Sequence, residues 1–173
     1  VDASRAQVLV DLGEGVTDCA VVRSGRLVAT DALRLGVADL RAAVRAWLVE
    51  GAGLRLGEIE AERALRAAGV APGRHARRRV HVVGSPCRGP GPTRAWIDVE
   101  PLHAAIDPVV DRIMARIGAF VATQAEALGP DLLDAGVCLS GGGALLGGMV
   151  ERGVGGLGVA VWGAPDPLLA VGG

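Results

Sequence analysis

Short apolar runs alternate with turn residues over the first fifth of the chain. The runs lie at residues 8–10, 19–22 and 27–33, and the segments between them, 13–15 and 23–26, contain glycine. Apolar segments of this length, bounded by turn residues, are typical of strands that fold back on one another. The pattern predicts a three-stranded meander at the start of the chain.

Apolar residues at helical spacing follow the meander. The helices predicted by this spacing cover residues 39–50, residues 58–68 and a long segment that starts near residue 98. Asp39 and Asp98 stand at two of these starts, where a short polar side chain suits the N-cap. Pro108 is expected to kink or split the long helix, because proline removes a hydrogen-bond donor from a helix interior.

Four further apolar runs predict strands between and after these helices. They cover residues 80–83, 93–97, 137–139 and 159–162, and a short helix is expected from Ala144. Strands first, then strands alternating with helices, indicate an α/β layered fold.

Composition excludes several classes of function. Half of the residues are hydrophobic but only 2% are aromatic, so the core is expected to be aliphatic. The net charge of -1 provides no field to attract nucleic acid. The three cysteines show no metal-ligand spacing, which favours free thiols in a reducing compartment. With no apolar stretch long enough to span a bilayer, we expect a cytoplasmic protein without a direct membrane anchor.

The first glycine-rich loop contains candidate phosphate ligands. Asp11 ends an apolar strand, and Gly13, Glu14 and Gly15 follow it. Glycines allow backbone N–H groups to approach a phosphate closely. Thr17 adds a hydroxyl donor, and Asp11 is placed to hold Mg²⁺ through water. The alternative is a tight hairpin whose glycines serve only the turn.

A second glycine-rich loop follows the apolar run at residues 137–139. Gly141, Gly142 and Gly143 come after this strand and lead into Ala144 and Leu145. Glycines that open a helix place N–H groups and the positive end of the helix dipole at the loop, which suits a nucleotide. The alternative is that these glycines only allow a strand and a helix to pack closely.

In this order, the two loops resemble the second phosphate loop and the adenosine loop of the actin, Hsp70 and sugar-kinase superfamily. The resemblance is closest to MreB-type bacterial actins, whose motif DIGGGTTD/E is similar to DLGEGVTD at residues 11–18. Other segments that resemble the family are residues 56–62 (IGE..AE), 84–97 (RG..L..GLP..I), 107–108 (EP) and 164–169 (AEDPL).

This resemblance implies an actin-like ATPase domain with an RNase H-like mixed sheet, flanking helices and a small helical lobe. The chain would be the second major actin domain, with a core at about residues 1–49 and 81–173 and the helical lobe at about 50–80. ATP and Mg²⁺ are the implied cofactors, with Glu62 near the nucleoside. Leu65 stands where the family has a lysine.

The resemblance also implies that the first domain, with the other phosphate loop, lies outside this chain. Weak ATP binding and doubtful ATPase activity are therefore expected. The predicted function is that of an MreB-like cytoskeletal, cell-shape protein that modulates full-length MreB-type filaments or self-associates. Any membrane association would be made through a filament partner. The alternatives are an ATPase completed by self-association or by a separately encoded first domain, and a remnant without function.

Overall fold

The structure is a computed structural model that describes residues 6–71 and 79–166. A five-stranded sheet forms one end of the molecule, with the order β3-β2-β1-β7-β8. Its strands are β1 (Gln7–Leu12), β2 (Thr17–Arg23), β3 (Arg26–Leu33), β7 (Val137–Ser140) and β8 (Val161–Gly163).

This sheet is mixed, as predicted. Strand β1 pairs antiparallel with β2, and β2 pairs antiparallel with β3, which confirms the meander. Strand β1 also pairs parallel with β7. Alternate side chains of β1, namely Val8, Val10 and Leu12, are buried. Since the side chains of a strand alternate between two faces, the other residues of β1 face the opposite side.

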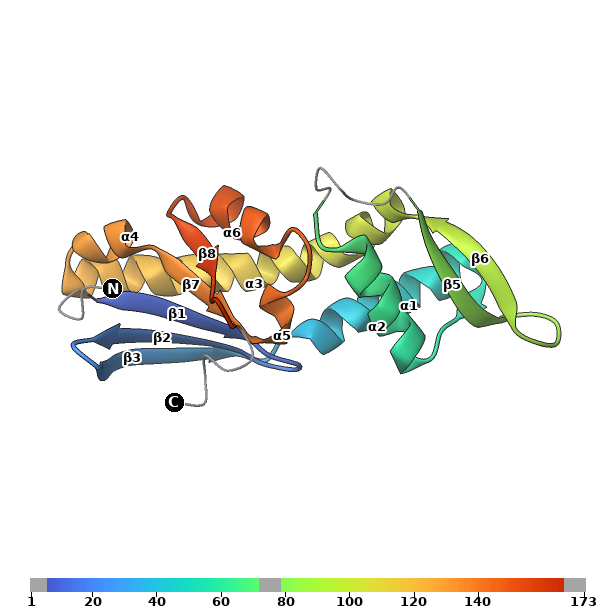
Figure 1. The fold of residues 1–173 in the computed structure, drawn as a ribbon, viewed down its shortest axis with the longest axis horizontal. Coiled ribbons are helices and arrows are strands. Elements are labelled where there is room, and N and C mark those ends of the chain that lie inside the picture. Colours follow the sequence, from blue (N-terminus) through green and yellow to red (C-terminus); the bar gives the residue numbers. More distant parts are fainter. Residues whose placement is uncertain (1–5, 72–78, 167–173) are drawn as a thin grey trace.

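Six helices flank the strands of the described residues. They are α1 (Val37–Ala52), α2 (Glu58–Ala68), α3 (Val99–Leu128), α4 (Asp131–Ala135), α5 (Gly141–Ala144) and α6 (Met149–Leu157). Figure 1 shows α3 running lengthwise along an elongated molecule, behind β7 and β8 and on toward α2. It packs against α4, α6, β2 and β3 at one end and against α1 and α2 toward the other. The described helices and sheets confirm an α/β fold with a mixed sheet and flanking helices.

Of the two effects expected of Pro108, a kink or a split, the split is wrong, because helix α3 continues through this residue. Pro108 is exposed, whereas Ile106 and Val110 on either side of it are buried in the core. Burial of the apolar face on both sides of the proline offsets the missing hydrogen bond.

The two predicted N-caps differ from the structure. Helix α1 begins two residues earlier than expected, with Gly36 as its N-cap, and Asp39 accepts a hydrogen bond from the Gly36 N–H (2.8 Å). Asp98 does occupy the N-cap position of α3, but without a side-chain capping bond. Its carboxylate pairs instead with Arg79, 3.0 Å away.

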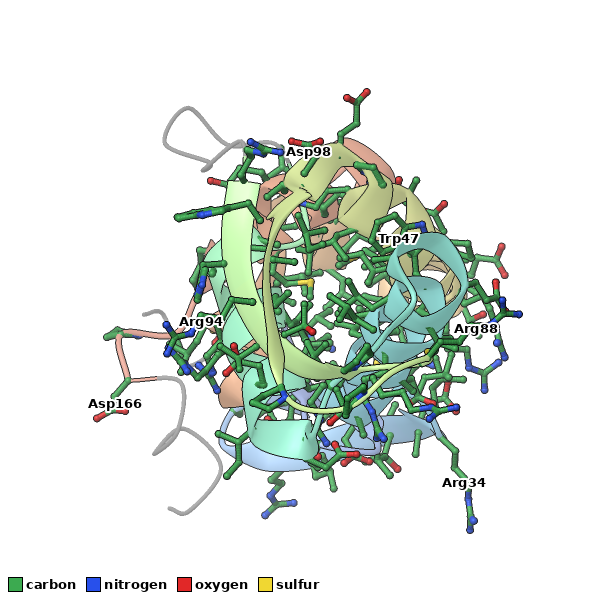
Figure 2. All side chains as sticks on the ribbon, turned by 90° about the vertical axis from the view of Figure 1, so that its right-hand side faces the viewer. Arg34, Trp47, Arg88, Arg94, Asp98 and Asp166 are labelled. Atoms are coloured by element: carbon green, nitrogen blue, oxygen red, sulfur yellow. The ribbon has the colours of Figure 1, made fainter. Side chains whose placement is uncertain are left out.

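A second sheet, β4-β5-β6, forms the other end of the molecule. Its strands are β4 (Leu54–Arg55), β5 (Arg79–Pro86) and β6 (Thr93–Asp98). In Figure 2 the β5–β6 hairpin curves over the side chains behind it, with Arg88 and Arg94 at the periphery. The hairpin thus lies with β4 and α2 and not in the five-stranded sheet. The division into a core and a lobe at residues 50–80 stays a prediction, and residues 72–78 lie outside the described part.

The buried core is mainly aliphatic, with Phe120 as an aromatic member, and it is continuous between the two ends. Its largest fully buried side chains include Leu40, Leu48, Leu65, Ile106 and Ile117. Within the described residues, no helix combines the length and the apolar character that crossing a bilayer requires.

Candidate functional site

Strands β1 and β7 bring the two glycine-rich loops together. Asp11 and Ser140 are register partners in the parallel ladder. Because neighbouring parallel strands end at the same edge of a sheet, the loops that follow them start side by side. The candidate residues of both loops therefore lie at one site.

The first loop packs against the start of α1. The Gly13 N–H donates to the Val16 carbonyl oxygen (2.9 Å) and closes the turn. The carbonyl oxygens of Gly13 and Glu14 accept hydrogen bonds from the N–H groups of Val37 (3.1 Å) and Ala38 (2.8 Å). The backbone of the turn is thereby fixed, while the side chain of Glu14 and residue Gly15 are exposed.

Thr17 has a different place from the one expected. Its side chain is 1% exposed, and its hydroxyl donates to the carbonyl oxygen of Leu35 (2.9 Å). With its proton used in this bond, the hydroxyl does not face a ligand as a donor. Thr17 instead joins β2 to the segment that leads into α1.

The second loop is shorter than the sequence indicated, because the helix that follows it begins earlier, and it packs closely against the end of β1. Helix α5 starts at Gly141, three residues before the predicted start at Ala144. Gly141 has a φ of +80°, and a Cβ there would lie 2.2 Å from Asp11 Oδ1. A Cβ on Gly143 would lie 2.7 Å from the Leu12 Cβ, whereas one on Gly142 would meet nothing within 4 Å. Gly141 and Gly143 therefore allow the loop to pack closely against β1, whereas Gly142 faces open space.

Asp11 carries an unusual buried carboxylate oxygen. Among the described residues, its Oδ1 is the only buried side-chain oxygen or nitrogen that has no hydrogen-bond partner. Burial and then the charge of Asp18 raise the pKa of Asp11, and the Ser140 side chain partly offsets this effect. Since an unpaired buried carboxylate is unfavourable, a cation that reaches this oxygen would be stabilising.

A metal ion at Asp11 would need ligands beyond protein side chains. In residues 6–71 and 79–166, no three His, Cys, Asp or Glu residues gather as metal ligands. Mg²⁺ suits such a place, because it keeps several waters and is often shared between one carboxylate and substrate phosphates.

Glu62 is connected to the first loop by a network of ion pairs around Arg41, which the sequence does not reveal. Arg41, on α1, contacts Glu14 in the first loop and both Glu58 (3.0 Å) and Glu62 (3.2 Å) on α2. Glu62 also accepts a bond from Arg66 (2.6 Å). The hydrogen bond with Arg41 lowers the pKa of Glu14, and the bond with Glu14 raises the pKa of Arg41. The sequence marks Arg41 only as a basic residue near the start of a helix.

The second loop is joined to the end of α2. The Val70 N–H donates to the Gly147 carbonyl oxygen (2.8 Å), and a Cβ on Gly69 would lie 2.5 Å from the same oxygen. His103 Nε2 donates to the Ala68 carbonyl oxygen (3.0 Å) and fixes the same end of α2 to α3. The site is thus framed by both loops, the start of α1 and helix α2.

Several solved structures share this fold. By structure, the chain is similar to MreB5 of Spiroplasma citri bound to AMPPNP, with a TM-score of 0.90, 20% identity, and coverage of 99% of this chain and 52% of that one. It is also similar to the MamK double helical filament, with a TM-score of 0.70, 16% identity, and coverage of 93% and 50%. EutJ of Carboxydothermus hydrogenoformans matches with a TM-score of 0.61, 18% identity, and coverage of 95% and 46%.

These likenesses show the fold, and the chain spans about half the length of the structures that it matches. By sequence, it matches the family of MreB/Mbl proteins over residues 1–173. The match covers the whole sequence and includes both glycine-rich loops. The chain therefore belongs to the MreB/Mbl family.

Proposed function

We propose that these residues form one side of an MreB-type nucleotide site in an actin-like cytoskeletal system. The observation that supports this most directly is the register pairing of Asp11 with Ser140, which places both loops at one sheet edge. The unpartnered Oδ1 of Asp11 at the same point fits a Mg²⁺–nucleotide complex.

Apart from Thr17, each candidate residue has a place in this proposal. Asp11 would hold Mg²⁺ through water, and the turn at residues 13–15 would lie along the phosphates. The glycines at residues 141–143, with Ala144 and Leu145, would border the nucleoside, and Glu62 would lie on its far side. Mg²⁺, when bound, neutralises charge on the phosphate oxygens. The related MreB5 of Spiroplasma citri has been crystallised with AMPPNP and with ADP.

Binding by this chain alone is expected to be weak. Actin-type sites hold the nucleotide between two domains, and these residues supply the groups of one. A loss of about 4 kcal/mol of contacts lowers affinity about a thousandfold. We therefore expect a dissociation constant in the millimolar range.

Calorimetry with Mg²⁺–ATP tests the nucleotide site. Asp11→Asn should weaken binding and reduce its dependence on Mg²⁺, because the amide does not carry the carboxylate's charge. Asp134→Asn, an exposed change in α4 with the same loss of charge, should bind like the unmodified chain. Equal affinities for both variants and the unmodified chain would contradict the proposed role of Asp11.

The cytoskeletal part of the proposal concerns filaments. We propose that the chain acts in the cytoplasm on MreB-type filaments or by self-association, and that it contributes in this way to cell shape. MamK, which shares the fold, forms a double helical filament. The test is co-sedimentation with polymerised MreB, and the absence of the chain from the pellet would count against this part. Phosphate release, with and without added first domain, tests the alternative of a shared ATPase.

A further inference from the structure

Arg41 holds its guanidinium at the junction of the first loop and α2. Its side chain is 15% exposed and contacts three carboxylates at once, those of Glu14, Glu58 and Glu62. The last two lie on α2 and fix the guanidinium from one side. Glu58 is itself held by Arg45.

Glu14 meets the same guanidinium from the side of the loop. Both of its carboxylate oxygens are engaged, since Arg41 Nη2 donates to Oε1 and Nη1 donates to Oε2 (3.2 Å). Two parallel bonds of this kind are also how arginine binds phosphate oxygens. The carboxylate of Glu14 thus occupies a position suited to phosphate.

The two partners differ in how easily they can move. The side chain of Glu14 is 65% exposed, so its ion pair with Arg41 contributes little to stability. Its backbone carbonyl is held by the Ala38 N–H (2.8 Å). Glu14 can therefore swing its side chain away without a change in the loop, while Arg41 keeps its contact with Glu62, whose side chain is 26% exposed.

We propose that Arg41 is a phosphate-binding residue of the nucleotide site and that Glu14 blocks it until the nucleotide phosphates replace the Glu14 carboxylate. This inference rests on the proposed nucleotide site. It assigns the chain its own cationic phosphate ligand and an internal competitor for it. The ligand class is a nucleoside polyphosphate, and the competitor sits in the first glycine-rich loop.

The test measures affinity for Mg²⁺–ATP by calorimetry in four forms: the unmodified chain, Glu14→Gln, Arg41→Gln and the double variant. Glu14→Gln removes the competing charge and should tighten binding about tenfold. Arg41→Gln should weaken binding to a similar extent. In the Arg41→Gln background, Glu14→Gln should change affinity by less than about twofold, because its effect acts through Arg41.

Two controls separate this effect from charge and from folding. Glu126→Gln, an exposed change on α3, makes the same change in net charge and should leave affinity unchanged. Arg41→Lys keeps a positive charge but cannot form the paired bonds, and should restore only part of the affinity. Thermal unfolding of each variant shows whether Arg41→Gln still folds, and Arg41→Lys carries the test if it does not.

The outcomes distinguish this proposal from the one on which it rests. Tighter binding by Glu14→Gln that disappears without Arg41 supports it. If the unmodified chain binds and Glu14→Gln binds equally or less tightly, this inference is overturned and the nucleotide site stands. If neither the unmodified chain nor Glu14→Gln binds up to millimolar Mg²⁺–ATP, both proposals are overturned.

Discussion

Gly141 and Asp11 lie so close that no side chain fits between them. A Cβ on Gly141 would come within 2.2 Å of Asp11 Oδ1 and within 2.6 Å of the Leu12 carbonyl oxygen. This contact fixes the second glycine-rich loop against the end of β1. The same contact helps to cover Asp11 Oδ1, which is buried and has no hydrogen-bond partner.

Gly141→Ala should therefore destabilise the fold. The new methyl group would meet Asp11 and the Leu12 backbone, and alanine is also strained at a φ of +80°. We expect a loss of about 2–3 kcal/mol in the free energy of unfolding. Gly142→Ala is the matched control, because its Cβ would meet nothing within 4 Å. Urea unfolding of both variants checks this, and equal midpoints would show that the loop relaxes freely.

Asp11→Asn should stabilise the chain in the absence of nucleotide, and more so at higher pH. In the folded chain the pKa of Asp11 is raised above its ordinary value of 3.8. The protonated carboxyl group therefore contributes stability below pH 3.8, and this contribution is lost as the pH rises through the folded-state pKa. The side-chain amide of asparagine does not titrate, so the Asp11→Asn variant does not lose stability in this way. We expect a higher Tm for Asp11→Asn than for the unmodified chain at neutral pH, and little difference near pH 4.

Thermal unfolding across this pH range is the measurement. A variant with Asp18→Asn should show part of the same effect, because the Asp18 charge contributes to the raised pKa of Asp11. A constant difference in Tm between Asp11→Asn and the unmodified chain at all pH values would contradict this prediction.

The three cysteines should differ in reactivity toward alkylating reagents. Cys19 is buried, and burial raises its pKa to about 12, so very little thiolate exists at pH 8. Burial also raises the pKa of Cys138. We expect Cys87, between β5 and β6, to be labelled first and Cys19 only after unfolding. Timed alkylation followed by mass spectrometry gives the order, and Cys87→Ser should remove the fast phase.

Pro108→Ala should stabilise helix α3. The substitution restores a backbone donor in a continuous helix, at an exposed position where the side chain itself contributes little packing. Greater freedom of the unfolded chain offsets part of the gain. A net increase of about 1–2 kcal/mol in the free energy of unfolding is expected. Urea unfolding tests this, and an unchanged midpoint would contradict the prediction.

Much of the fold was predictable because it depends on local patterns. The meander and helix α2 follow from short-range periodicity, and both have the predicted positions in the structure. The parallel pairing of β1 with β7 joins residues about 130 positions apart, so short-range periodicity does not show it, and the family resemblance predicted only that the sheet is mixed.

The missed features depend on contacts between distant elements. The Thr17 hydroxyl donates to the Leu35 carbonyl oxygen, and Arg41 connects the first loop to α2. Neither contact has a short-range signature in the sequence. The long helix continues through Pro108 because tertiary burial outweighs the local effect of proline. The start of α5 at Gly141 was missed for a similar reason, since only the neighbouring Asp11 shows why a glycine must stand there.

Helix α3 makes the two ends of the molecule mechanically dependent on each other. At 30 residues it is about 45 Å long, and it contacts α1 and α2 toward one end and α4, β2 and β3 toward the other. A rod of that length converts a tilt of a few degrees at one end into a displacement of a few ångströms at the other. A shift of α2 against the glycine-rich loops would therefore be amplified at the far edge of the five-stranded sheet.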